Sequence, residues 1–218
     1  MLEPEVEGRP WSEQLLADDA SYRDQLAYLF DRSPFYRRTL KAAGIASAAE
    51  AGGLAEISHL PLTEKHEIKA TCTAENPFGA HLCARPEEIV RIYSTSGTTG
   101  VPSFIPLTSG DLDNWITGSA RSYAASGVVA GQRIVSTYNV GPFAAGAALA
   151  AFDRIGLCHI PVGTGNTERL LVAIERLKPH AAVLTPSYAA YAIEWAAERG
   201  VDLHNKSVER VQDRKSVV

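Results

Sequence analysis

After residue 102, the sequence alternates between short apolar runs and longer amphipathic stretches, and this alternation strongly limits the possible folds. The apolar runs have the length of strands and lie at residues 133–137, 157–161 and 181–184. Each run is followed by a stretch with helical spacing, at residues 143–155, 168–177 and 187–199. Repeated strand-helix units predict an α/β fold, with a mainly parallel sheet, right-handed crossovers and helices covering the sheet.

In open sheets of this kind, ligands bind beyond the carboxyl ends of the strands, so we expect binding residues in the loops after residues 137, 161 and 184. The middle loop contains Gly163 and Gly165, as a dinucleotide-binding motif would. Glu168 stands where that motif has its third glycine, and a carboxylate there would repel a pyrophosphate. A Rossmann site is therefore disfavoured.

A loop rich in glycine and hydroxyl groups precedes this region. Its residues are Ser94, Thr95, Ser96, Gly97, Thr98, Thr99 and Gly100. The two glycines allow backbone N–H groups to converge on an anion, and the hydroxyls add donors without charge. The loop is not a Walker A motif, because Val101 and Pro102 follow where that motif has Lys and Ser or Thr. Composition alone fits a phosphate-binding nest and an ordinary turn between two strands equally well.

The region before this loop, residues 11–87, is expected to be mostly helical and irregular. A first helix should run to about Asp31 and end near Ser33, with a packed apolar face. That face comprises Leu15, Leu16, Tyr22, Leu26, Leu29 and Phe30. A second short helix should end at Gly44, and Thr63 should cap a third.

Directly after the loop, residues 103–107 are expected to form a strand. Pro106 lacks an N–H group, so we place it at a sheet edge or a bulge. The spacing of Thr108 and Asp111 is that of a capping box, which predicts a helix that ends near Gly127.

The charge balance argues against a nucleic-acid partner. The chain has 21 Lys and Arg residues against 25 Asp and Glu residues, a net charge of −4, and no basic run with interleaved aromatic residues. The longest weakly polar stretch, residues 140–152, is shorter than the roughly 20 residues of a membrane span and is expected to be a buried helix.

The cysteines and the N-terminus favour a reducing, cytoplasmic location. Three cysteines without a C-x-x-C pair do not indicate a disulfide framework, and the acidic N-terminus lacks the order of a signal peptide. Cys72, His81 and Cys83 match no standard zinc spacing, so we expect no metal held by these side chains.

Residues 93–102 resemble the signature loop of the adenylate-forming enzymes, the superfamily of AMP-dependent synthetases and ligases. Many members have Lys directly after the proline, whereas Ser103 is more similar to the phenylacetate-CoA ligase branch, in which a small polar residue is usual. The segments at residues 33–36, 60–65 and 76–79 resemble the N-terminal region of that branch, in the same order. The chain thus resembles the N-terminal portion of a phenylacetate-CoA ligase.

This resemblance implies an acid-CoA ligase that adenylates a carboxylic acid, aromatic and similar to phenylacetate, with ATP and then passes the acyl group to coenzyme A. The loop of residues 94–100 would hold the β and γ phosphates of ATP, with Mg²⁺ offsetting their charge. Tyr138, Phe143 and Gly146 would line the acid pocket, with Gly146 leaving room for a ring. Core packing explains the two aromatic side chains equally well. No catalytic residue is assigned, because in the resembled family the catalytic lysine belongs to a later domain.

Three regions are expected: a helical lead-in at residues 1–87, an incomplete AMP-binding domain at residues 88–212, and a tail at residues 213–218. The tail corresponds to one reading frame of a common sequencing adapter, so we expect it to be non-native and the chain to be a truncated record. Such a fragment should be inactive and should aggregate through an unpaired sheet edge. Two alternatives stay open: a stand-alone nucleotide-binding or regulatory module, and an adenylating enzyme with another acceptor, such as a carrier protein.

Overall fold

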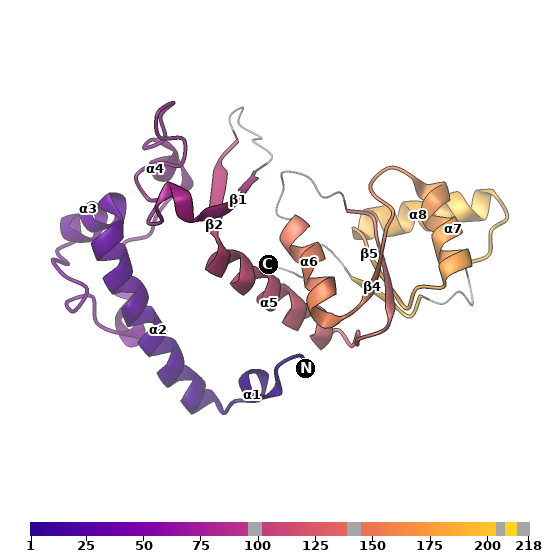
Figure 1. Cartoon of the computed structure of the whole chain (residues 1–218), viewed down its shortest axis with the longest axis horizontal. Helices are drawn as coiled ribbons and strands as arrows, with labels where there is room; N and C mark the ends of the chain where they lie inside the picture. The colour runs from indigo at the N-terminus through magenta and orange to yellow at the C-terminus, as the bar shows by residue number, and fades with distance from the viewer. Residues whose placement is uncertain (96–101, 139–144, 204–207, 213–218) are drawn as a thin grey trace. The chain divides into compact units, whose positions relative to one another are not determined.

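The computed structural model describes residues 1–95, 102–138, 145–203 and 208–212, and its chain divides into two compact units (Figure 1). The first unit is Pro4–Ser109, and the second combines Met1–Glu3 with Gly110–Val218. The expected division between a helical lead-in and an α/β part at residue 87 stays a prediction, as does the non-native tail, which lies outside the described residues.

The first unit begins with helices. They are α1 (Pro4–Glu7), α2 (Trp11–Arg32), α3 (Pro34–Ala42), η1 (Leu54–His59), α4 (Lys65–Lys69) and η2 (Pro86–Glu88), of which η1 and η2 are 3₁₀ turns. The predicted end of the first helix is confirmed. Ser33 separates α2 from α3, and its hydroxyl accepts a hydrogen bond from the Tyr36 N–H at 3.2 Å, which caps α3.

Two details of this helical region differ from the sequence-based expectation. Only Leu26 of the expected apolar face of α2 is buried, and Leu16 is 75% exposed. α2 packs mainly against α3 and η1. These two short elements do not cover the apolar face along all 22 residues of α2. The cap of α4 lies one residue later than expected: Glu64, not Thr63, holds the N-cap position, and its N–H donates to the Glu67 carboxylate at 2.7 Å.

The first unit ends in a two-stranded antiparallel ribbon. It consists of β1 (Ile89–Ser94) and β2 (Phe104–Thr108). Tyr93 and Leu107 are buried, whereas Pro106 lies opposite Ile92, and in a sheet of two strands each strand has an unpaired edge. The expected edge position of Pro106 is confirmed. The ribbon holds the glycine-rich loop between its two strands.

The second unit has the predicted α/β architecture. Its elements are α5 (Ser109–Ala125), β3 (Arg133–Ser136), α6 (Ala145–Ile155), β4 (Cys158–Pro161), α7 (Thr167–Leu177), β5 (Ala181–Val183), α8 (Pro186–Glu198) and β6 (Arg210–Gln212). The strands are ordered β4-β3-β5-β6, and each neighbouring pair is parallel. β6, which the sequence did not predict, extends the sheet beyond β5.

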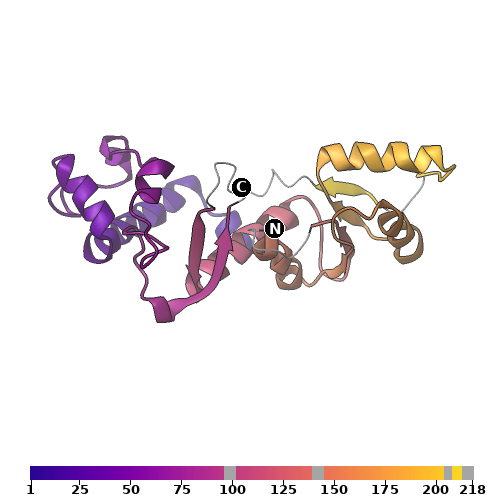
Figure 2. The same ribbon diagram turned by 90° about the horizontal axis from the view of Figure 1, so that it is seen from above.

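Two buried clusters lie on opposite faces of this sheet. Ile134 of β3 packs with Tyr123 of α5 and Phe152 of α6, whereas the next residue, Val135, packs with Leu170 of α7 and others. Successive residues of a strand point to opposite faces, so α5 and α6 cover one face and α7 and α8 the other. Figure 2 shows α8 running along one face of the strands. Within the described ranges, no helix combines the length and apolarity needed to cross a membrane.

Candidate functional site

The base of the glycine-rich loop is closed by hydrogen bonds between its two ends. Thr95 N–H donates to the carbonyl oxygen of Ser103, and Ser103 N–H donates to Thr95 Oγ1, both at 3.0 Å. Ser94, the last residue of β1, pairs with Phe104. The remaining predicted phosphate-binding residues, Ser96, Gly97, Thr98, Thr99 and Gly100, lie outside the described residues, so the assignment of the loop stays a prediction.

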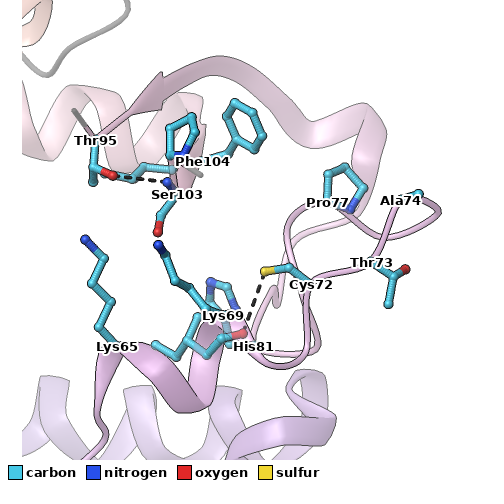
Figure 3. Close-up of a pocket in the computed structure, with 13 residues that line it drawn as sticks. Lys65, Lys69, Cys72, Thr73, Ala74, Pro77, His81, Thr95, Ser103 and Phe104 are labelled. Atoms are coloured by element: carbon cyan, nitrogen blue, oxygen red, sulfur yellow. Dashed lines mark hydrogen bonds between the residues drawn. The ribbon is translucent and has the colours of Figure 1, made fainter. Parts of the chain in front are cut away.

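A cavity of about 720 Å³ opens beside this loop base (Figure 3). α4 and the residues that follow it form one wall, and Thr95, Ser103 and Phe104 form another. A third part of the lining comes from Pro77 and His81. All of these residues belong to the first unit, so the cavity lies within that unit.

The cavity brings two lysines to the loop base. Lys65 and Lys69 are four residues apart and therefore lie on the same face of α4. In Figure 3 both side chains extend from α4 toward Thr95 and Ser103. No Asp or Glu is among the described residues that line the cavity. The described lining is therefore positively charged and otherwise mostly apolar or neutral.

Two residues that line the cavity each have a buried polar atom without a hydrogen-bond partner among the described residues. These atoms are Ser103 Oγ and His81 Nδ1. Burial lowers the pKa of His81 below its ordinary value, so its ring is neutral at neutral pH. Both residues line the cavity, and each atom has an unused capacity to form a hydrogen bond.

A network of short-range hydrogen bonds holds this wall of the cavity. Thr71 Oγ1 donates to the Ile68 carbonyl at 2.8 Å and accepts from the Ala80 N–H at 2.9 Å, which joins the end of α4 to the segment that carries His81. Gly79, with φ +78°, lies against Thr71, because a Cβ at Gly79 would be 2.6 Å from Thr71 Oγ1. The positions of Lys69 and His81 thus depend on a glycine turn.

The sequence-based reasoning missed Lys65 and Lys69 as site residues. Lys65 was noted only within a family-like segment, and Lys69 was not singled out. Their spacing of four residues indicates that both lysines lie on one face of a helix. It does not indicate which other part of the chain that face lies against.

The residues expected in the acid pocket belong to the second unit. Tyr138 follows β3 and packs against the cluster that contains Tyr123 and Phe152, and Gly146 lies half-buried in the first turn of α6. Burial raises the pKa of Tyr123, with a smaller contribution from Tyr138, so both rings share this interior. Phe143 lies outside the described residues, and the role of all three in substrate binding stays a prediction.

The loops at the carboxyl ends of the strands are joined by side-chain hydrogen bonds. The Thr164 hydroxyl, in the loop after β4, donates to the Thr137 carbonyl after β3 at 2.9 Å. Thr167, at the start of α7, and Tyr188, near the start of α8, have their hydroxyls 3.1 Å apart. The strand ends at which ligands are expected are therefore held together.

Metal-binding chemistry receives no support from the described side chains. Cys72, Cys83 and Cys158 are free thiols. Nowhere in residues 1–95, 102–138, 145–203 and 208–212 do three or more His, Cys, Asp or Glu side chains gather in a way that could hold a metal ion.

Comparison with known sequences identifies phenylacetate-coenzyme A ligases as relatives. The chain is 33% identical over 210 residues to the enzyme of Thermus thermophilus, covering 96% of this chain and 46% of that protein. It is 32% identical over 170 residues to the enzyme of Escherichia coli, covering 78% of this chain and 38% of that protein. The chain therefore spans less than half the length of these relatives. No protein-family model matches it.

Comparison with solved structures also identifies a CoA ligase, one named for a different acid. A 2-hydroxyisobutyryl-CoA ligase, solved with 2-hydroxyisobutyryl-AMP and coenzyme A, superposes with a TM-score of 0.88 and 26% identity. The match covers 96% of this chain and 45% of that one. The predicted α/β class and the resemblance to the N-terminal portion of adenylate-forming CoA ligases are confirmed.

Proposed function

Because this chain resembles the N-terminal portion of phenylacetate-CoA ligases over nearly its whole length, we propose that it is the front part of an ATP-dependent acid-CoA ligase. One observation carries this proposal: the structural match to a CoA ligase, at a TM-score of 0.88, extends over 96% of the chain. The match includes the ribbon that bears the glycine-rich loop and the sheet whose strand ends are expected to bind ligand. The proposed reaction has two steps, formation of an acyl-adenylate and pyrophosphate, then of a coenzyme A thioester.

In the first step, the loop of residues 94–100 would bind the β and γ phosphates while the carboxylate of the substrate attacks the α phosphate. Carboxylates are ionised at neutral pH, so this step requires positioning and charge stabilisation more than a general base. The hydrogen bonds between Thr95 and Ser103 support this role, because they fix the ends of the loop before ATP arrives. Mg²⁺ would add positive charge at the phosphates. No Asp or Glu lines the described cavity, so the described lining offers no carboxylate ligand for this ion.

We propose an aromatic acid as the substrate. The curated relatives that the chain matches are named for phenylacetate, and Tyr138 offers an aromatic face near the carboxyl end of β3. Gly146, without a side chain, leaves room for a ring. The solved relative is named for a small aliphatic acid, 2-hydroxyisobutyrate. That acid is therefore the substrate to compare with phenylacetate.

The test uses the protein encoded by the open reading frame that contains this chain. We expect ATP–pyrophosphate exchange that depends on added acid, and thioester formation when coenzyme A is also present. Phenylacetate should support faster exchange than 2-hydroxyisobutyrate. Equal rates with and without acid would refute the ligase assignment, and faster exchange with the aliphatic acid would refute only the aromatic substrate. Exchange without transfer to coenzyme A would point to another acceptor.

A further inference from the structure

Thr137 lies where β3 leaves the sheet, and both of its backbone groups are hydrogen-bonded there. Its N–H donates to the carbonyl of Val183, the last residue of β5, at 3.2 Å. Its carbonyl accepts a hydrogen bond from the Thr164 hydroxyl at 2.9 Å. Thr137 is only 4% exposed, so loss of this bond would leave a carbonyl with little access to water. A side chain from the loop after β4 therefore fixes the end of the neighbouring strand.

The loop after β4 is short and reaches back over the end of β3. It continues the pairing of the two strands by one residue, since the Val162 N–H donates to the Ser136 carbonyl at 2.9 Å. Thr164 then lies between Gly163 and Gly165, both with φ +81°, a conformation that glycine adopts without the steric cost that other residues incur. The strand before this loop and α7 after it thus set where the Thr164 hydroxyl lies.

The Thr137 carbonyl belongs to the same peptide group as the Tyr138 N–H. This group is planar, so a hydrogen bond that holds the carbonyl also sets the direction in which the chain enters Tyr138. Tyr138 is half-buried and packs against the cluster that contains Tyr123 and Phe152. The hydroxyl of Thr164 therefore acts on the backbone from which the Tyr138 ring projects.

We propose that Thr164 is a positioning residue for the acid substrate, because its hydrogen bond to the Thr137 carbonyl orients the Tyr138 ring. The inference rests on the proposed ligase function and deepens it, since it names a determinant of which acid is selected. Thr164 itself does not need to touch the substrate. An aromatic acid that packs against the Tyr138 ring depends on the orientation of this ring more than a small aliphatic acid does.

The test uses two variants of the protein encoded by the open reading frame that contains this chain. Thr164→Val keeps the shape of the side chain and removes the hydroxyl, whereas Thr164→Ser keeps the hydroxyl. In acid-dependent ATP–pyrophosphate exchange, Thr164→Val should raise KM for phenylacetate about fivefold, the effect of one lost hydrogen bond. KM for ATP, KM for 2-hydroxyisobutyrate and the maximal rate should stay nearly unchanged, because the ring of the acid is bound before the reaction. Thr164→Ser should restore KM for phenylacetate.

A second measurement does not depend on activity. Amide hydrogen exchange should become about fivefold faster in Thr164→Val for fragments that contain Thr137 and Tyr138, because the end of β3 opens more readily. Thr39→Val is the matched control. The Thr39 hydroxyl also donates to a backbone carbonyl, that of Phe35 at 3.1 Å, but it does so within α3 of the first unit. This control should leave KM for phenylacetate and amide exchange at Tyr138 unchanged.

Each result decides the question. In an active ligase, an unchanged KM for phenylacetate would overturn the inference and leave the proposed function standing. Equal increases in KM for phenylacetate and for either ATP or 2-hydroxyisobutyrate would also overturn it, as would a loss that Thr164→Ser does not restore.

A protein that shows no exchange with any acid would refute the proposed function. In that case, or if phenylacetate alone supports no exchange, the amide measurement decides the inference. Faster exchange at Tyr138 that Thr164→Ser reverses would keep Thr164 as the residue that positions this peptide group. Unchanged exchange would overturn that role.

Discussion

Gly44 and Gly79 both have positive φ but differ in their surroundings. Replacing each with alanine therefore distinguishes the cost of backbone strain from the cost of a side-chain clash. Gly44 (φ +85°) has no atom within 4 Å of a built Cβ, whereas a Cβ at Gly79 (φ +78°) would lie 2.6 Å from Thr71 Oγ1. We expect Gly44→Ala to lower the free energy of unfolding by about 1 kcal/mol, the cost of the left-handed conformation. Gly79→Ala should cost about 1–3 kcal/mol more, because Thr71 must move from its hydrogen bonds.

Urea unfolding of both variants, followed by circular dichroism, tests this difference. Similar losses of stability in the two variants would show that the contact with Thr71 is unimportant.

A half-buried histidine in the sheet predicts how the free energy of unfolding changes with pH. His159 of β4 lies 2.7 Å from the Ser136 hydroxyl of β3, and burial lowers the pKa of His159, with a smaller opposing effect from Asp153. Above a pH of about 6.5, the ordinary histidine value, neither the folded nor the unfolded chain is protonated here. Below it, the unfolded chain takes up the proton first, so the free energy of unfolding falls.

We therefore expect His159→Gln to lose less stability than the unsubstituted protein between about pH 7.5 and pH 5.5. Urea unfolding at both values measures the difference. His81, whose pKa is lowered in the same direction, remains in both proteins and leaves part of the dependence in place. If His159→Gln lost as much stability between the two pH values as the unsubstituted protein, the role of His159 would be contradicted.

At the scale of elements, local signals predicted the helices and strands of the second unit well. β3, α7, β5 and α8 lie within one residue of the expected ends, because apolar periodicity and turn residues act over short distances. β6 escaped prediction because its three residues carry no periodic pattern and are held by pairing with β5. The face of α2 was misjudged for a related reason: the sequence shows an apolar stripe, but not which elements will cover it.

The cap of α7 gives a prediction for this scale. Asn166 Oδ1 accepts a hydrogen bond from Arg169 N–H at 2.9 Å, which satisfies one of the free donors of the first turn. Asn166→Ala should lower the free energy of unfolding by about 1 kcal/mol. Asn166→Asp should retain the stability, because Asp caps equally well and its charge suits the helix N-terminus. Equal loss in both variants in urea unfolding would argue against capping.

At the scale of the whole molecule, the sequence indicates a candidate phosphate-binding loop but not the lysines that line the cavity beside its base. The glycines and hydroxyls of residues 94–100 form one continuous segment, so their chemistry can be read directly. Lys65 and Ser103 line the same cavity only because the first unit folds, and nothing local to α4 specifies this arrangement. Resemblance points to the segment that contains Lys65, and the structure shows that Lys65 lines the cavity beside the loop base.

The second unit exposes an apolar groove, and this groove is relevant to whether the 218-residue chain associates with itself. The groove has a volume of about 250 Å³ and lies between α7, α8 and β6, with Leu171, Ile174 and Ile193 in its lining. Ile193 and Val211 are each 60% exposed, and β6 is an edge of the described sheet. An apolar groove beside an unpaired strand favours association between chains.

We therefore predict that the 218-residue chain self-associates when produced alone. Light scattering coupled to size exclusion should show an average mass that rises with concentration, and Ile193→Lys with Val211→Lys should lower it, because charges at an exposed edge oppose pairing. Leu62→Lys is a suitable control, since Leu62 is 92% exposed in the first unit and outside the groove. A chain that stays monomeric, unfolds cooperatively and binds ATP would contradict this prediction. That outcome would favour the stand-alone nucleotide-binding module over the ligase portion.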